Sequence, residues 1–396
     1  MPLPLIALFV AAFAFGTTEF VIAGILPQVA DGLGVSIPSA GFLVTGYAAG
    51  IAIGGPILTV LTARVSRTNL LIAIALVFTV GQVACALAPG FASMLAFRVF
   101  IAFAHGVYFG VAMVVATSLV PEHQRGRAVA IVLAGLTVSN ILGVPAGTAI
   151  GNAFGWRATF WAMFILGVIA TIAMLAFLPR KGAAATARPA GFMSEVRVLG
   201  RQQVWSSLIV MLTLMISQFV PYTYITPFLT EVTGIEPGMV TWVLLLNGIG
   251  CTLGVFLGGR LADWHLMPSL IALLVLQALI MVAMYFASPH PWVMIPTMFV
   301  WGCVAFAIGT PIQTRILGWT TDAPNLASAL IPSGFNFGIA LAASIGAFLL
   351  SSDYGYRSLP VLGIGAMVIG AIVATLSYAA ERRSGAKPPM PAVASS

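Results

Sequence analysis

The sequence is divided into long apolar runs, separated by short clusters of charged residues, Pro and Gly. A run of roughly 20 apolar residues is long enough for a helix to cross the hydrocarbon core of a bilayer. Only 7% of the 396 residues are charged, whereas a soluble domain carries about 25%. Such a chain cannot cover itself with polar surface in water. We therefore expect an all-α membrane protein, because helices satisfy their own backbone hydrogen bonds in hydrocarbon.

The apolar runs predict twelve membrane spans. A basic stretch rich in Ala, Gly and Pro separates six spans from six, and the C-terminal tail has the composition of a disordered segment. The predicted domains are an N-terminal bundle at 1–178, a cytoplasmic linker at 179–203, a C-terminal bundle at 204–380 and a disordered cytoplasmic tail at 381–396. The predicted spans are 4–26, 38–62, 69–88, 91–118, 126–152, 158–178, 204–229, 239–262, 268–287, 291–316, 325–350 and 356–380.

The basic residues predict the orientation of these spans. Fourteen of the seventeen Lys and Arg residues, Arg315 among them, fall on the side that holds both termini. Arg157 and Arg357 fall on the opposite side, and Arg98 lies within a span. Cytoplasmic loops carry the excess of Lys and Arg, so we expect both termini in the cytoplasm. The net charge of +7 therefore reflects topology and the anionic lipid surface, and it does not indicate nucleic-acid binding.

The two halves repeat weakly at one offset of 200 residues. Like-oriented repeats indicate a transporter plan in which an axis along the membrane normal relates the halves, and substrate binds near the midplane between them. The matched pairs are ILPQV (25–29) with ITPFL (225–229), LTAR (61–64) with LADW (261–264), and GWR (155–157) with GYR (355–357).

Four stretches carry a resemblance to a known family. They are GTTEFVIAGILPQVA (16–30), GGPILTVLTARVSRTNLL (54–71), LAFRVFIAFAHGVYFG (95–110) and GLTVSNILGVPAGTAIG (135–151). Together they resemble the major facilitator superfamily, and within it the twelve-helix drug:proton antiporters near the bacterial chloramphenicol-resistance and sugar- or purine-efflux members. The resemblance implies the major facilitator fold in a bacterial inner membrane, a monomer, and alternating access driven by protons.

The loop after the second span resembles the family's cytoplasmic gate motif. Arg64 and Arg67 match its basic positions, but Ala63 stands where the family has an acid, and the second half keeps Asp263 instead. The resemblance implies charge pairs that hold the gate. The alternative is that both arginines are ordinary cytoplasmic anchors.

The fifth span resembles the family's antiporter motif in a shifted register. Its matching residues are Gly143, Pro145, Gly147 and Gly151. Glycines spaced by four let a neighbouring helix approach closely, and the proline removes a backbone hydrogen bond and can bend the helix. The alternative is a packing face without antiporter meaning.

Three ionisable residues are expected inside the membrane. Glu19 is the one acid of ten that falls away from loops and helix ends, and His105 follows Arg98 on the same face of the fourth span. Glu19 lies ~6 Å beyond the midpoint of its span, and Arg98 ~10 Å inside the outer end of its own. A charge at the bilayer centre costs at least about 2.5–3.5 kcal/mol, so such groups usually have a function.

Glu19 is therefore the predicted proton site. Burial disfavours the charged carboxylate and a nearby arginine favours it, so a site between these effects can bind and release a proton. The resemblance links Arg98 to proton transfer, and His105 can relay the proton. The alternative is a static Glu19–Arg98 pair that fixes packing.

Polar and aromatic side chains on the spans expected to face the centre are candidates for binding an amphipathic organic substrate. Singly, each is more often a packing residue. They are Phe15, Thr18, Glu19, Asn140, Gln218, Tyr222, Tyr224, Asn247, Trp301, Phe335 and Asn336.

Two other functions are alternatives to proton-coupled export. A facilitator or importer of a small polar solute is disfavoured by the helix 5 motif and by the acid in the first span. A membrane enzyme is disfavoured because no metal-ligand cluster, nucleophile constellation or phosphate-binding loop is present. The sequence predicts no metal or organic cofactor, with the proton as coupling ion.

Overall fold

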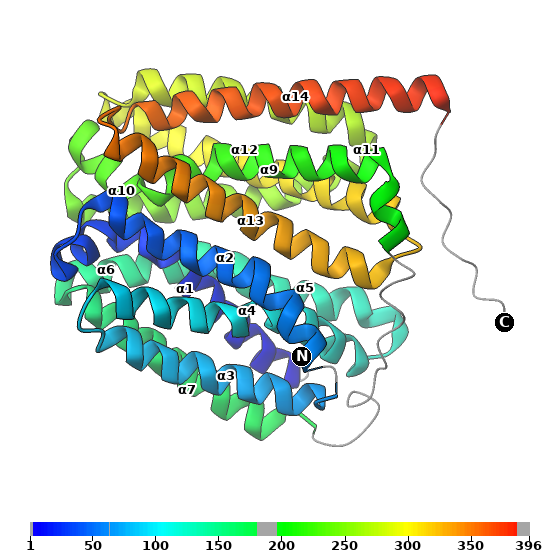
Figure 1. Cartoon of the computed structure of the whole chain (residues 1–396), viewed down its shortest axis with the longest axis horizontal. Helices are drawn as coiled ribbons and strands as arrows, with labels where there is room; N and C mark the ends of the chain where they lie inside the picture. The colour runs from blue at the N-terminus through cyan, green and yellow to red at the C-terminus, as the bar shows by residue number, and fades with distance from the viewer. Residues whose placement is uncertain (1–2, 63, 180–195, 386–396) are drawn as a thin grey trace.

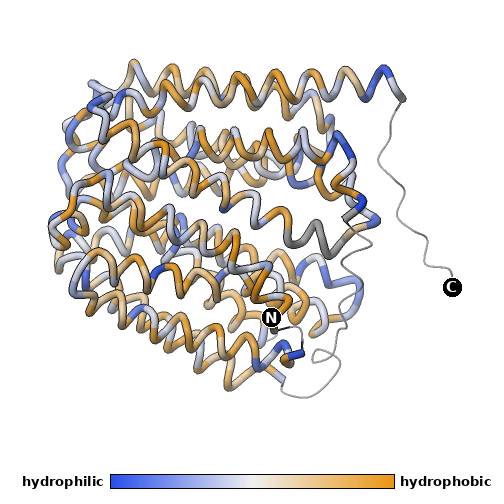
Figure 2. Tube along the Cα trace, in the orientation of Figure 1, coloured by the Kyte–Doolittle hydropathy of each residue, from blue (hydrophilic) through white to orange (hydrophobic). Residues whose placement is uncertain are grey.

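Long helices running side by side make up the chain in the computed structural model, which describes residues 3–62, 64–179 and 196–385 (Figure 1). Apolar residues cover the middle of these helices, and hydrophilic residues gather at their ends (Figure 2). The α-helices are α1 Leu3–Leu33, α2 Ile37–Leu61, α3 Arg67–Ala86, α4 Phe91–Ser118, α5 Arg125–Val138, α6 Val144–Phe154, α7 Trp156–Phe177, α9 Gln202–Thr223, α10 Ile225–Pro227, α11 Pro237–Ala287, α12 Pro291–Trp319, α13 Pro324–Ser351 and α14 Ser358–Ser384. Short 3₁₀ segments occupy Glu122–Gln124 and Val196–Gly200, and single π-helical turns occupy Ser139–Gly143 and Phe228–Val232.

The prediction of twelve spans is confirmed once α11 is divided in two. Eleven helical stretches among the described residues are long and apolar enough to cross a membrane. However, α11 has 51 residues and would extend about 76 Å, more than twice the hydrocarbon thickness. His265 has non-helical φ and ψ of −149° and 88°. It breaks α11 between the two predicted spans, 239–262 and 268–287.

The first helix is longer than predicted. We expected it to end before Pro27, but α1 continues to Leu33 with Pro27 inside it. Proline has no N–H for the carbonyl four residues earlier, which is that of Ala23. The Thr226 hydroxyl donates to this carbonyl over 2.7 Å, so the freed acceptor keeps a partner and the helix can continue.

Two predicted spans contain irregular turns. The fifth is α5, a π-helical turn and α6 in succession, with the π turn just before Pro145. The seventh ends as α9 at Thr223 and continues through α10 and a second π turn. At the C-terminus α14 extends to Ser384, four residues into the predicted tail. Residues 180–195 of the predicted linker and 386–396 of the tail lie outside the described residues, and the domain boundaries stay a prediction.

The offset of 200 residues is visible in matching contacts of the two halves. Gly155 and Gly355 both have positive φ, 84° and 70°; Gly155 directly precedes α7, and Gly355 lies three residues before α14 begins. Two residues later, the Arg157 guanidinium donates to the carbonyl of Ala88, and the Arg357 guanidinium donates to that of Tyr285. The two halves are therefore built from like-oriented repeats of six spans.

Equivalent glycines also hold equivalent helix pairs together. Gly50 of α2 lies against the Val99 carbonyl of α4, and Gly250 of α11 lies against the Phe299 carbonyl of α12. The number of each second-half residue exceeds that of its first-half counterpart by 200, so residues of α2 and α4 can be compared position by position with those of α11 and α12.

The two halves are bonded to each other at one end of the bundle. We call the end where α1 begins the termini end and the opposite end the far end. The halves pack through α2 against α13 (Figure 1) and through α5 and α6 against α11. Among the described residues, the hydrogen bonds that join the halves lie toward the far end. They link Thr45 with Ser344, Asn152 with Pro237, and Thr226 with Ala23 and Gly24.

Candidate functional site

A stripe of glycines on the fifth span brings α1 into close contact with it. Gly143, Gly147 and Gly151 face Thr17, Val21 and Ile25 of α1 in the same order. Closer to the termini end, Gly135 lies against Ala12 and the backbone of Phe9 and Phe13. The antiporter-like glycines thus act as the close-packing face expected from their spacing, and the helix that they hold carries Glu19.

Glu19 begins a chain of polar groups inside the first half. Its side chain is 10% exposed, and Oε2 lies 3.9 Å from Nε2 of His105 on α4. The other ring nitrogen of His105, Nδ1, lies 3.1 Å from the hydroxyl of Tyr47 on α2. Phe15 stacks on the His105 ring with 4.8 Å between ring centroids. Three helices thus bring a carboxyl, an imidazole and a phenol into a row.

Arg98 lies next to this row and is fully buried. Its Nε donates to the carbonyl of Leu43 over 3.1 Å, and Nη1 donates to the carbonyl of Thr18 over 3.3 Å. Its guanidinium carbon is 4.4 Å from the Tyr47 ring centroid, a cation–π contact. Nη2 has no hydrogen-bond partner. The static Glu19–Arg98 pair, the alternative to a proton site, does not form, since the ion-pair contact of Glu19 is with His105.

Thr18 connects Arg98 to a further buried side chain. While its carbonyl accepts from Arg98, its hydroxyl accepts from Nε2 of Gln82 on α3 over 3.1 Å. Gln82 is fully buried, and its Oε1 is left without a partner. Thr18 was predicted to bind substrate, but both of its polar groups are bonded within the protein.

Aromatic rings connect this region to the second half. Phe20, next to Glu19, lies with its ring centroid 5.8 Å from that of Phe219 and 6.5 Å from that of Tyr222. Tyr222 in turn is 6.2 Å from Trp301, whose Nε1 donor is buried without a partner. Buried acceptors on Gln218 and Asn336 are also unpartnered. These residues offer apolar faces together with a few free polar groups, as a small-molecule site requires.

The remaining predicted substrate contacts have no ring contact with this set. The Tyr224 hydroxyl donates to the Ala343 carbonyl over 2.9 Å, and its ring packs against glycines of α2 and α13. Asn140 and Asn247 donate to the carbonyls of Leu136 and Met298. Phe335 is half-buried, and no ring contact joins it to the other predicted residues.

The predicted gate residues are not paired with one another. Arg64 and Asp263 are exposed and Arg67 is half-buried, and none of them forms an ion pair with another described residue. Ala63, which stands in the acid's place, lies outside the described residues.

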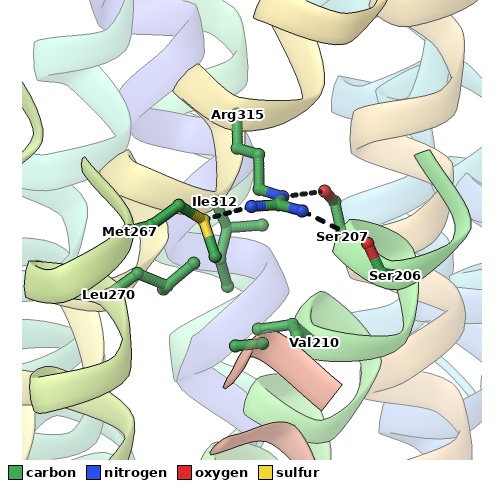
Figure 3. Close-up of a pocket in the computed structure, with 8 residues that line it drawn as sticks. Ser206, Ser207, Val210, Met267, Leu270, Ile312 and Arg315 are labelled. Carbon is green, nitrogen blue, oxygen red and sulfur yellow. Dashed lines mark hydrogen bonds between the residues drawn. The ribbon is translucent and has the colours of Figure 1, made fainter. Parts of the chain in front are cut away.

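The prediction that Arg98 is the one buried basic residue is wrong. Arg315 of α12 is 3% exposed and forms a 2.5 Å ion pair with Glu381 of α14. Its guanidinium also donates to Ser206 and Ser207 of α9 and contacts the Met267 sulfur (Figure 3). Arg315 stands at the end of an apolar run, where the sequence does not distinguish a buried arginine from a solvated anchor.

Tyr47 was also missed. It lies in an apolar span, where a tyrosine is ordinarily a packing residue. The signal available in the sequence was only its place in the second span of the half that also holds Glu19, Arg98 and His105. Spacing along the chain does not show which residues of different helices meet.

The part of the chain that the structure describes forms twelve spans in two like-oriented halves, with a buried ionisable site in the first half. This arrangement defines a multi-pass membrane transporter. The chain belongs to the Major Facilitator Superfamily, because the family profile of that description matches residues 8–318.

Relatives and a solved structure support this assignment over almost the whole chain. The Escherichia coli inner membrane transport protein YdhP is 40% identical over 380 residues, 96% of each chain. A chloramphenicol resistance protein of Streptomyces lividans is 32% identical over 383 residues, again 96% of each. A bacterial homologue of the human lysosomal transporter Spinster, solved in an inward-facing and unoccupied conformation, shares the fold with a TM-score of 0.75 and 18% identity, over 98% of each chain.

Proposed function

We propose that this transporter exports small amphipathic organic compounds, such as chloramphenicol-like drugs, in exchange for protons. The observation that carries the proposal is the placement of Glu19, a mostly buried carboxyl facing His105 within a polar network that includes Arg98. Ionisable groups inside a membrane are costly and usually functional. The basic excess at the termini end supports cytoplasmic termini, and a relative named as an inner membrane protein supports a bacterial inner membrane.

The repeat shows that the fold does not require these groups. The second-half counterparts of Glu19, Arg98 and His105 are Phe219, Met298 and Ala305. The same arrangement of helices is therefore built there with uncharged side chains at these three positions, so the ionisable groups at the equivalent positions of the first half serve something besides packing. Proton binding by Glu19 when substrate leaves, and release when substrate binds, is the coupling that we infer.

The substrate region that we propose is the set of rings from Phe20 to Trp301. Its position beside Glu19 lets substrate and proton compete for one place. The free donor on Trp301 and the free acceptors on Gln218 and Asn336 suit an uncharged aromatic compound with polar substituents. The chloramphenicol resistance relative supports a drug of this kind. The protein is proposed to act as a monomer without a metal or organic cofactor.

The test measures chloramphenicol transport by the full chain in proteoliposomes under an imposed pH gradient. We expect Glu19→Gln to reduce gradient-driven transport to the level of protein-free vesicles, because the amide cannot exchange a proton. The exposed Glu236 offers a matched control, and Glu236→Gln is expected to transport like the native protein. Full gradient-driven transport by Glu19→Gln would refute proton coupling at this site. Transport that ignores the pH gradient in the native protein would instead indicate a facilitator, and pH-driven transport of sugars or purines but not chloramphenicol would change the substrate class.

A further inference from the structure

Tyr47 contacts both His105 and Arg98 inside the first half. It is 1% exposed. Its hydroxyl is 3.1 Å from Nδ1 of His105, and its ring lies under the Arg98 guanidinium at 4.4 Å. We propose that Tyr47 is a positioning residue, which holds His105 with its Nε2–H directed at Glu19. The inference rests on the proposed function, since it concerns the same proton site.

The hydrogen-bond chemistry of the imidazole carries the inference. A neutral histidine donates from one ring nitrogen and accepts at the other. When the Tyr47 hydroxyl donates to Nδ1, the ring proton must be on Nε2, the nitrogen 3.9 Å from the Glu19 carboxylate. His105 then presents a donor to the ionised carboxyl. Without the hydroxyl, Nδ1 would be a buried acceptor with no partner, and the ring could adopt the other tautomer.

The second contact of the Tyr47 phenol is with the Arg98 guanidinium, which lies over its ring. Arg98 interacts with Glu19, Tyr47 and Cys85, so α1, α2 and α3 each present a titratable group to it. Tyr108 of α4, whose ring stacks on Phe15, turns its hydroxyl to the carbonyl of Leu8 instead. The cation below the Tyr47 ring fixes the ring plane, and the hydroxyl then fixes the histidine.

The second half supports a role beyond packing. The counterpart of Tyr47 is Asn247, whose amide donates to the carbonyl of Met298 over 2.7 Å. Met298 is the counterpart of Arg98. At this level of the fold, a neutral amide therefore suffices to join the two helices, and no imidazole needs to be oriented.

Tyr47→Phe is the sharpest test, because it removes the hydroxyl and keeps the ring below Arg98. Tyr108→Phe is the matched control, a buried tyrosine whose hydroxyl bonds to a backbone carbonyl and not to His105. The measurement is chloramphenicol transport in proteoliposomes as a function of pH. We expect Tyr47→Phe to shift the pH of half-maximal transport upward by about half to one unit, the effect of losing one hydrogen bond to the ionised state. Tyr108→Phe is expected to keep the native midpoint.

A native midpoint in Tyr47→Phe, or an equal shift in Tyr108→Phe, would overturn the proposal. A second measurement needs neither a transport assay nor a folded Tyr47→Phe variant. Nitrogen-15 histidine spectra of the purified native protein near neutral pH, with the His105 signal assigned through His105→Gln, report which ring nitrogen carries the proton. We expect the Nε2–H form, and the Nδ1–H form would overturn the proposal. If Glu19→Gln retains coupled transport while the spectra show Nε2–H, the proposed function fails and the positioning by Tyr47 stands.

Discussion

Two arginine–carboxylate pairs of the second half show how burial changes the contribution of an ion pair to the stability of the protein. Arg315 and Glu381 are 3% and 13% exposed, and serines of α9 and α14 complete their hydrogen bonds. Arg201 donates two bonds of 2.7 Å to Asp322, but the two side chains are 30% and 47% exposed. The Arg201 guanidinium holds the pKa of the Asp322 carboxyl below its usual range.

Glu381→Gln is expected to lower the stability of the protein by about 3 kcal/mol, because it leaves the Arg315 charge buried without a counter-charge. Asp322→Asn is the matched control and should cost less than about 1 kcal/mol, since water screens an exposed pair. Because the Asp322 pKa is depressed on folding, its small contribution is present above about pH 4 and is lost as the pH falls below that. Melting of both variants in one detergent at pH 7 measures the difference, and equal melting temperatures would contradict it.

At the residue scale, the sequence could indicate Glu19, Arg98 and His105 because each interrupts an apolar run. It could not indicate Arg315 or Tyr47. Arg315 stands at a span end, where arginine is common, and its burial depends on serines of α9 and an acid of α14. Tyr47 matters through a hydroxyl that meets another helix. Partners on different helices are set by packing, which spacing along one helix does not encode.

At the element scale, the glycine stripe of the fifth span sets the position of α1 and hence of Glu19. A Cβ on Gly147 would come 2.5 Å from Cγ2 of Val21. Valine is branched at Cβ and cannot turn its methyl groups away freely. A single added methyl group must therefore move one helix relative to the other.

Gly147→Ala is expected to destabilise the protein by about 1–3 kcal/mol, the usual cost of overpacking, and to reduce transport by displacing Glu19. Gly110→Ala is the matched control, because nothing lies within 4 Å of a Cβ placed there on α4. It should be neutral or slightly stabilising, since alanine favours helix more than glycine does. Melting and transport assays on both variants check this, and equal behaviour of the two would show that the stripe does not position α1.

Element ends were predictable to the extent that local sequence decides them. The fourth span was predicted at 91–118 and begins and ends there, where polar residues and Pro flank the run. The end of α1 was not predictable, because the hydroxyl of Thr226, in the other half, donates to the carbonyl that the missing N–H of Pro27 leaves free. The π turn before Pro145 likewise depends on how the fifth span fits against α1.

For the whole molecule, the distribution of bonds between the halves defines one conformational state. The described bonds between the halves lie toward the far end, where the Thr226 hydroxyl reaches the carbonyls of Ala23 and Gly24 and Asn152 reaches that of Pro237. With cytoplasmic termini, as proposed, this is the state closed to the outside. Alternating access requires these bonds to break, so the Thr226 contact opposes opening of the far end.

Thr226→Val is expected to raise the fraction of molecules open at the far end about fivefold, because losing one hydrogen bond of about 1 kcal/mol shifts a two-state equilibrium by that factor. Thr223→Val is the matched control, a buried threonine whose hydroxyl bonds to the Phe219 carbonyl of its own helix. Spin labels at Phe154 and Met239, exposed residues of the two halves at the far end, report the distance between them in a background with Cys303 replaced by Ala. Longer distances should gain population in Thr226→Val alone. If both variants keep the native distribution, or change it alike, the carbonyl that Pro27 frees has no part in closing the transporter.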